Sequence, residues 1–323
     1  TDRLSFTGGI RYTEDTKRFT PDTFIIANNN DRVPPPLLGF DPGQVPPIPP
    51  PGFLILPTDE AEVTFDEVTL LGNISYAVSE TVLSYFTYSQ GFKSGGFTQR
   101  VFPFLPEAPS YQPETVDVYE LGLKTTFFDR RLRMNAAAFY TDYSDLQFVV
   151  QDETVAPVVR NAGAATIKGF EIDLTAVPVE GLLLEIGVGY VDAGYDEVDP
   201  GTGVTTDNEL VKTPKWSSSL GVSYRMPVSA GASITPRLDW SYSGSYFNNA
   251  INSSQIFQDS YHILNAGLSY ENEDLGLVLS ALGKNLTDER FMSAGFSDAV
   301  NLGSHEAVFD RGRQWMLTVK KSF

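Results

Sequence analysis

The chain has no cysteine and only two histidines among its 323 residues. Without cysteine there is no disulfide, thiolate metal site or cysteine nucleophile, and two histidines leave little room for a histidine-rich metal site. No stretch approaches the ~18 consecutive apolar residues of a membrane-spanning helix. Acidic residues outnumber basic ones by 41 to 23, which makes the chain a poor partner for nucleic acid. These absences leave a soluble protein or a transmembrane β-barrel.

Alternation of apolar and polar residues with a period of two is the main signal that is present. Residues 216–226 place Trp216, Leu220 and Tyr224 on one face, and mostly serine and glycine on the other. This period predicts β-strands. Twelve strands are predicted in this way, at 3–13, 66–77, 81–92, 115–128, 131–148, 169–176, 182–190, 216–226, 233–243, 260–271, 275–288 and 311–323. Many exceed the ~5–6 residues of soluble strands and suit tilted membrane strands, which need ~9–11.

The predicted connections alternate strictly between short and long. The short ones are 78–81, 128–131, 177–181, 227–231 and 271–275, and the long ones are 14–65, 93–114, 149–163, 192–214, 248–259 and 290–310. Short turns at one end and long loops at the other are typical of an outer-membrane barrel, with the turns in the periplasm and the loops outside. The even strand count places Phe323 on the periplasmic side. The predicted fold class is therefore all-β, an antiparallel transmembrane β-barrel.

Aromatic residues lie toward the ends of the apolar stripes, where the headgroups of a bilayer would sit. They are Tyr76, Tyr190, Trp216, Tyr224, Trp240, Tyr242, Tyr270 and Trp315. The alternative is that these rings fill the core of a soluble β-sandwich, which would then be a binding module.

Charged residues inside the predicted strands are expected to face the barrel lumen. A lysine or arginine facing lipid near the midplane costs about 2–4 kcal/mol, whereas the lumen is wet. The predicted lumen-lining residues are Glu120, Lys124, Arg133, Glu171, Asp173, Glu185, Arg225, Arg237, Asp239 and Lys284.

No enzyme chemistry is predicted. His262 and His305 are the candidate bases for a serine nucleophile, but no serine has a recognisable nucleophile context. The acidic residues between Asp192 and Asp199 do not have the spacing of a calcium loop. We therefore predict no catalytic residue, metal site or cofactor. The segment 14–65 carries two proline runs and is expected to be a long external loop.

Five segments, in order along the chain, resemble motifs of the TonB-dependent outer-membrane receptors. They are Thr1–Asp15, Tyr88–Phe97 (ending Lys93-Ser94-Gly95-Gly96-Phe97), Pro113–Lys124 (ending Tyr119-Glu120-Leu121-Gly122-Leu123-Lys124), Asn161-Ala162-Gly163 followed by Gly169-Phe170-Glu171, and Gly283-Lys284-Asn285-Leu286-Thr287-Asp288. The resemblance implies a barrel of about 22 strands plugged by an N-terminal globular domain. It also implies uptake of a scarce nutrient, often a ferric siderophore, with energy from the TonB complex.

Against this family pattern, the chain is expected to be a partial barrel domain. Residues 1–323 match the last twelve strands, and no segment resembles the plug or the short TonB-binding box. An incomplete barrel exposes two strand edges, so we expect an open or distorted sheet. The runner-up hypothesis is a stand-alone twelve-strand pore or translocator, which requires strand 3–13 to close on strand 311–323.

The external loops are expected to bind a small-molecule chelate through aromatic stacking and cationic side chains. The candidates are Phe92, Lys93, Phe97, Arg100, Tyr111, Tyr246, Phe247, Phe257, Phe291 and Phe296. The alternative is that these residues pack the loops on each other. Cobalamin, heme, glycans and aromatic compounds remain open as cargo.

The C-terminal strand is expected to act as the signal for the barrel assembly machinery. Trp315, Leu317, Val319 and Phe323 share one face, although Lys321 stands where the family often has an aromatic residue. The other expected partners are outer-membrane lipid and lipopolysaccharide, the plug domain and the TonB complex. No nucleic-acid partner is expected.

Overall fold

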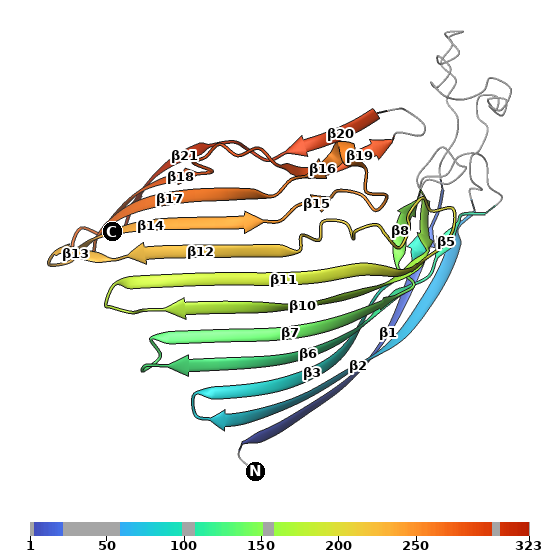
Figure 1. The fold of residues 1–323 in the computed structure, drawn as a ribbon, viewed down its shortest axis with the longest axis horizontal. Helices are drawn as coiled ribbons and strands as arrows, with labels where there is room; N and C mark the ends of the chain where they lie inside the picture. The colour runs from blue at the N-terminus through green and yellow to red at the C-terminus, as the bar shows by residue number, and fades with distance from the viewer. Residues whose placement is uncertain (1–2, 22–58, 99–106, 151–157, 299–303, 323) are drawn as a thin grey trace, which may run out of the picture.

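The computed structural model of the chain describes residues 3–21, 59–98, 107–150, 158–298 and 304–322. They form one large antiparallel sheet whose spatial order follows the chain order (Figure 1). Its strands are β1 (Leu4–Phe19), β2 (Ala61–Ser79), β3 (Val82–Lys93), β6 (Glu114–Phe127), β7 (Leu132–Ser144), β10 (Gly163–Ala176), β11 (Leu182–Val198), β12 (Trp216–Tyr224), β13 (Met226–Ser229), β14 (Ala232–Ser243), β17 (Tyr261–Asn272), β18 (Leu277–Lys284) and β21 (Gln314–Lys321). Because β12 and β13 both pair with β14 across the break at Arg225, the prediction of twelve successive strands is confirmed.

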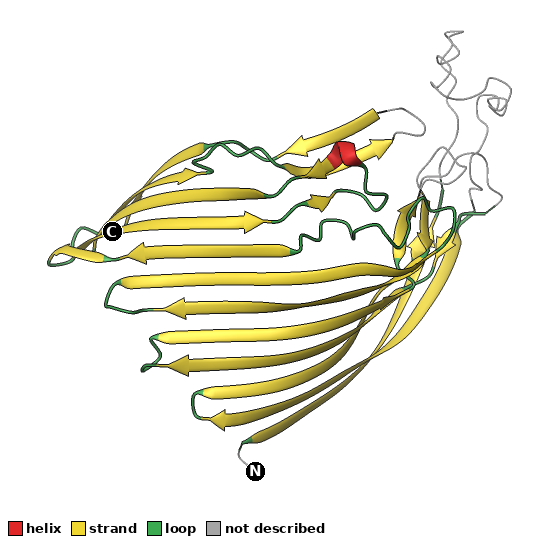
Figure 2. Ribbon diagram, viewed as in Figure 1, coloured by secondary structure: helices red, strands yellow, loops and turns green. Residues whose placement is uncertain are grey.

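Four small hairpins that the sequence did not predict lie at the end of the sheet that carries the long connections (Figures 1 and 2). They pair β4 (Gly96–Phe97) with β5 (Ser110–Tyr111), β8 (Gln147–Val150) with β9 (Val158–Asn161), β15 (Tyr246–Phe247) with β16 (Phe257–Gln258), and β19 (Met292–Asp298) with β20 (Ser304–Phe309). A short 3₁₀ helix, η1 (Ser254–Ile256), precedes β16. Short turns and both chain ends lie at the opposite end of the sheet.

Several strands run further toward the loops than predicted. The ladder between β1 and β2 continues to Phe19 and Ala61, inside the segment 14–65 that was expected to be a loop; the middle of that segment, 22–58, lies outside the described residues. Cross-strand polar pairs hold this extension, since Thr16 bonds Thr64 at 2.9 Å and Arg18 donates to Glu62 at 2.5 Å. The face that continues the apolar side of β1 is polar there, whereas Phe19 and the buried Phe65 lie on the opposite face. The apolar alternation used for prediction is therefore lost.

The sheet is open at both sides. β1 pairs with β2 and β21 pairs with β18, and within the described residues neither strand has a partner on its other side. Edge side chains are correspondingly uncovered: Leu317 on β21 is 84% exposed, against 37% for Leu220 in the middle of the sheet. The expected open form is confirmed, and the described strands do not make the closure that a stand-alone pore requires.

The strand registers define two faces. Leu220 lies level with Ile186 and Trp240 on the apolar face, and Gly221 lies level with Glu185 and Asp239 on the polar face. Nine of the ten predicted lumen-lining residues lie on the polar face by register, and Arg225 reaches it by donating to Ser233 at 3.1 Å. A β-sandwich would bury its apolar face under a second sheet, whereas Leu121 and Leu268 stay more than half exposed.

An aromatic belt crosses the apolar face obliquely. Tyr88, Tyr119 and Tyr140 lie level with one another, with neighbouring ring centroids 5.1 and 6.3 Å apart. The next aromatic row, Phe170, Tyr190 and Trp216, lies two residues nearer the turns, and Tyr242 with His262 a further two residues nearer. Strands that are tilted against a bilayer normal place a level belt in this stepped register.

Two glycines of the family-like motifs lie under aromatic rings on the polar face. A methyl group at Gly122 would stand 2.1 Å from the ring of Tyr85, its partner on β3, and one at Gly169 would stand 2.8 Å from Phe139 on β7. Each ring therefore approaches its glycine closely because no side chain stands there.

Substituting Gly122 tests this packing. Gly122→Ala forces Tyr85 out of its rotamer and should destabilise the intact protein by about 1–3 kcal/mol. Gly72→Ala is the matched control, because a methyl group there meets nothing within 4 Å. Urea unfolding in lipid vesicles measures both, and equal stability of the two variants would contradict the packing.

Candidate functional site

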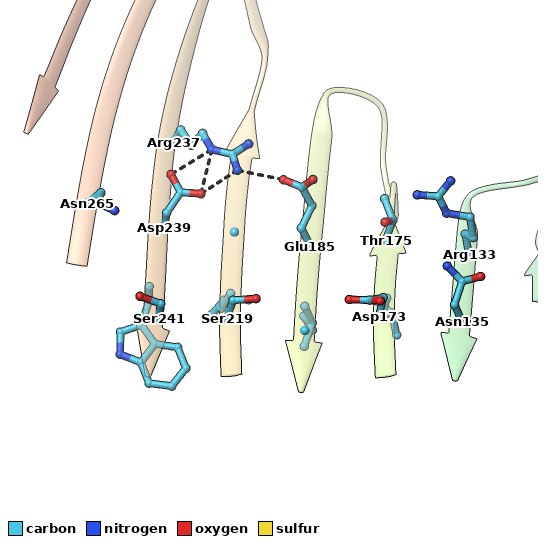
Figure 3. Close-up of a pocket in the computed structure, with 16 residues that line it drawn as sticks. Arg133, Asn135, Asp173, Thr175, Glu185, Ser219, Arg237, Asp239, Ser241 and Asn265 are labelled. Carbon is cyan, nitrogen blue, oxygen red and sulfur yellow. Dashed lines mark hydrogen bonds and ion pairs between the residues drawn. The ribbon is translucent and has the colours of Figure 1, made fainter. Parts of the chain in front are cut away.

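The polar face contains a hollow of about 480 Å³ whose lining includes Arg237 (Figure 3). Arg237 on β14 lies 2.7 Å from Asp239 and reaches across β12 to Glu185 on β11, at 3.0 Å. This crossing is possible because Gly221 occupies the β12 position between the two carboxylates, and a methyl group there would lie 3.2 Å from the guanidinium. The predicted lumen residues Glu185, Arg237 and Asp239 thus form one charge network.

Other charges of the polar face lack such partners. Among the residues that the structure describes, Arg133, Glu171 and Asp173 form no ion pair, and Figure 3 shows Arg133 and Asp173 beside the Arg237 network without joining it. Glu120 instead accepts a hydrogen bond from the Tyr85 hydroxyl at 2.6 Å, and the ammonium of Lys124 lies over the Tyr85 ring at 5.3 Å. The polar face therefore carries some charged residues that are paired or hydrogen-bonded and others that have no ion-pair partner among the described residues.

The loop end of the sheet forms a continuous wall, because each described loop contacts the next. Phe19 stacks on Phe97 at 5.7 Å. The Thr98 hydroxyl lies within hydrogen-bond distance of the backbone of Val159 on β9. Further along, the Lys212 backbone N–H donates to Phe247 at 2.9 Å.

An apolar mini-core joins the loops after β7 and β11. Phe148, Ala162, Ala165, Tyr195 and Val204 are buried together, and the rings of Phe148 and Tyr195 lie 5.3 Å apart. Burial raises the pKa of Tyr195 to about 12. The last two loops meet where the Tyr246 hydroxyl donates to the carbonyl of Met292 at 3.0 Å; burial raises the pKa of Tyr246 also to about 12.

Most of the loop residues predicted to bind a chelate contact other loop residues. Lys93 lies 3.8 Å from Glu114, the Tyr111 ring covers Gly96, Phe247 packs on Phe257 at 4.8 Å, and Phe291 stacks on Tyr261 at 4.2 Å. Phe92 lies level with Thr115 on the apolar face, away from the lumen. Phe296 on β19 stays 50% exposed, and Arg100 lies outside the described residues.

Residues of the family-like motifs pack under rings or bond the backbone of nearby loop residues. The sequence did not predict these roles. Gly95 lies directly under the buried ring of Phe65. Asn285 has φ +49° and bonds both the N–H and the C=O of Glu289. Gln147, which belongs to no motif, donates to three carbonyl groups, those of Lys93, Ser94 and Gln112. Side-chain-to-backbone bonds of this kind have no sequence period.

Within the part of the chain that is described, no three His, Asp or Glu side chains gather to hold a metal ion. The same residues contain no helix that is long and apolar enough to cross a membrane. On β21, Trp315, Leu317 and Val319 share the apolar face with Lys321. The terminal Phe323 of the predicted assembly signal lies outside the described residues.

A single curved antiparallel sheet with one apolar face, an oblique aromatic belt, short turns at one end and long loops at the other defines the wall of an outer-membrane β-barrel. Residues 1–286 match the family described as "TonB dependent receptor-like, beta-barrel". The chain belongs to this family, and it is a β-barrel protein of the bacterial outer membrane.

Curated relatives agree with this assignment. The chain is 26% identical over 220 residues to the probable TonB-dependent siderophore receptor PiuA of Acinetobacter baumannii, a match that covers 64% of this chain and 27% of the relative. It is 23% identical over 266 residues to the ferric-pyoverdine M114 receptor PbuA of Pseudomonas sp. strain M114, with 80% and 30% covered.

The fold is also shared with solved structures. The ferric yersiniabactin uptake receptor FyuA from Yersinia pestis superposes with a TM-score of 0.76 at 20% identity, covering 100% of this chain and 44% of that chain. The chain thus spans less than half the length of the relatives it matches.

The mini-core gives a prediction for high pH. Burial raises the pKa of the Tyr195 phenol to about 12 in the folded protein, from its ordinary value of 10.0. Because the folded value is the higher one, the neutral phenol stabilises the mini-core fully below pH 10, and this contribution is lost as the pH rises through about 12. Ultraviolet difference titration of wild type against Tyr195→Phe should show one late-titrating phenol missing. A difference curve centred near pH 10 would contradict the burial.

Proposed function

We propose that the chain forms the last twelve strands of a receptor barrel that takes up a ferric siderophore or similar chelate with energy from the TonB complex. The observation that carries this proposal is the charged polar wall under a continuous external loop wall, in a chain of the TonB-dependent receptor family. The names of PiuA, a probable TonB-dependent siderophore receptor, and PbuA, a ferric-pyoverdine receptor, support the same cargo class. The two open edges fit further strands of the same barrel.

The unpaired charges of the wall fit a polar domain inside the barrel. Arg133, Glu171 and Asp173 lie exposed on the polar face without ion-pair partners among the described residues, and each would need a compensating group if a domain covered it. In this proposal a plug domain supplies those groups and carries the contact with the TonB complex. Lipid and lipopolysaccharide meet the apolar face, and the barrel assembly machinery recognises β21.

The transport proposal is tested in cells. The intact receptor is expressed in a strain that lacks its own siderophore receptors, and uptake of radiolabelled ferric siderophores of the catecholate, hydroxamate and carboxylate classes is measured. We expect uptake of at least one class that stops when the TonB gene is deleted. Uptake of none of the classes, or uptake that persists without TonB, would overturn the proposal.

The pore hypothesis is distinguished by conductance. A stand-alone twelve-strand pore would give steady single-channel currents in a planar bilayer, and its solute flux would be independent of TonB. We expect the intact receptor to give no such currents, because a plug closes the lumen. Stable open channels would favour the pore.

Phe296 is the predicted loop aromatic that remains most available to a ligand. Removing the ring in Phe296→Ala should weaken chelate binding about 5-fold, which corresponds to the roughly 1 kcal/mol of one aromatic contact. Val308→Ala is the matched control, because Val308 is exposed on the same hairpin and has no ring. Equilibrium binding of the transported chelate measures both, and equal affinities would remove Phe296 from the site.

A further inference from the structure

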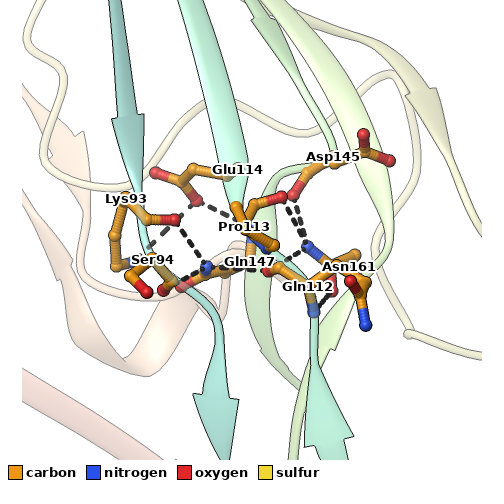
Figure 4. A network of polar contacts seen from close by, with 8 residues as sticks. All are labelled: Lys93, Ser94, Gln112, Pro113, Glu114, Asp145, Gln147 and Asn161. Carbon is orange, nitrogen blue, oxygen red and sulfur yellow. Dashed lines mark hydrogen bonds and ion pairs between the residues drawn. The ribbon is translucent and has the colours of Figure 1, made fainter. Parts of the chain in front are cut away.

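Two asparagine side chains bond from one external loop to the backbone of the next. Asn161, at the end of β9, accepts from the N–H of Gln112 at 2.7 Å and donates to the C=O of the same residue at 2.8 Å. Its amide also donates to the C=O of Asp145 at 2.8 Å (Figure 4). Gln112 belongs to the loop between β3 and β6, so one side chain joins the loops on either side of the β6–β7 hairpin.

Asn252 repeats this arrangement further along the wall. It accepts from the N–H of Glu209 at 2.6 Å and donates to the C=O of Glu209 at 3.0 Å. Asn252 lies in the loop between β14 and β17, and Glu209 lies in the loop between β11 and β12. Asn252 has φ +54°, a conformation that asparagine tolerates better than most residues.

The geometry has a simple physical meaning. A carboxamide carries one acceptor and two donors, so it bonds a backbone N–H and C=O in the way that a residue of a neighbouring strand does. Each asparagine therefore supplies one rung of an antiparallel ladder between loops that are not otherwise paired as strands. Aspartate has the same shape, but it cannot donate, and its charge would face carbonyl oxygens.

Further hydrogen bonds lie beside the contact between Asn161 and Gln112. Gln147 donates to the C=O groups of Ser94 and Gln112 at 3.1 and 3.0 Å, and its N–H donates to Glu114 at 2.9 Å. The polar network in Figure 4 thus connects the loop ends of β3 and β6 with β8. Next to this network, the N–H of Val159 donates to the hydroxyl of the buried Thr98.

We propose that Asn161 and Asn252 are positioning residues that couple successive external loops, so that displacement of one loop displaces the next. In a receptor these loops would then respond to a bound ligand as one body. Only this consequence rests on the proposed function, because the coupling itself is a property of the barrel with no ligand present.

Distances between loops test the coupling directly. Spin labels attached after the substitutions Ser110→Cys and Val149→Cys report the distance between the loops that Asn161 joins. Labels attached after Thr206→Cys and Gln255→Cys report the distance between the loops that Asn252 joins. The chain itself has no cysteine to compete for label. In the intact receptor in nanodiscs, Asn161→Asp should broaden the 110–149 distance distribution at least 2-fold, and Asn252→Asp should do the same for 206–255. Asn161→Ala, which removes both halves of the joint, is the second variant if the aspartate variant does not assemble.

Asn285→Asp is the matched control. Asn285 makes the same two-bond contact, but to Glu289 in its own loop, so both distributions should keep their widths. Thermal unfolding of the barrel is measured in parallel, and a purely stabilising role would lower the melting temperature without broadening. Unchanged widths in both coupling variants, or equal broadening by Asn285→Asp, would overturn the proposal. The labels report without any chelate, so this failure is distinct from failure of the transport assay.

Discussion

The backbone of a membrane-spanning strand has to be hydrogen-bonded by its neighbours, because lipid offers no donors or acceptors. Every other feature of this sheet follows from that constraint. The strands succeed one another in chain order because adjacent pairing is the shortest way to satisfy each backbone. The alternation of the two faces is then fixed by register, and the charges of Glu185, Arg237 and Asp239 come together on one side without any tertiary core.

The polar face shows how little side-chain bulk such a wall needs. Gly221 lets one guanidinium reach across β12 to β11, and Gly122 and Gly169 leave room for the rings of Tyr85 and Phe139. In a soluble domain these glycines would weaken the strands. Here the backbone ladder provides the cohesion, so the glycines shape the lumen surface, and this explains physically why the family-like motifs are rich in glycine.

The sequence predicted the twelve successive strands, and nine of its ten named charged residues lie on the polar face by register, since lipid imposes a period of two. It did not predict the β1–β2 ladder beyond Thr13, where Thr16 and Arg18 pair with polar partners and the apolar signal ends. It also missed the loop hairpins and the asparagine joints, because the bonds from Asn161 to Gln112 and from Asn252 to Glu209 depend on three-dimensional approach and leave no periodic trace.

The strands differ in how far they extend beyond the oblique aromatic belt at the loop end of the sheet. β1 runs on from Tyr12, an aromatic residue of its apolar face, to Phe19, and β11 runs on from Tyr190 in the belt to Val198. At ~3.3 Å per residue, ordered sheet extends about 25 Å past these two aromatic residues. β14 and β17 end one residue past Tyr242 and His262. The loop end of the sheet is therefore uneven. β1 and β11 extend far beyond the aromatic residues, whereas β14 and β17 end close to them. Loops that follow β14 and precede β17 can therefore change in length without disturbing strand register.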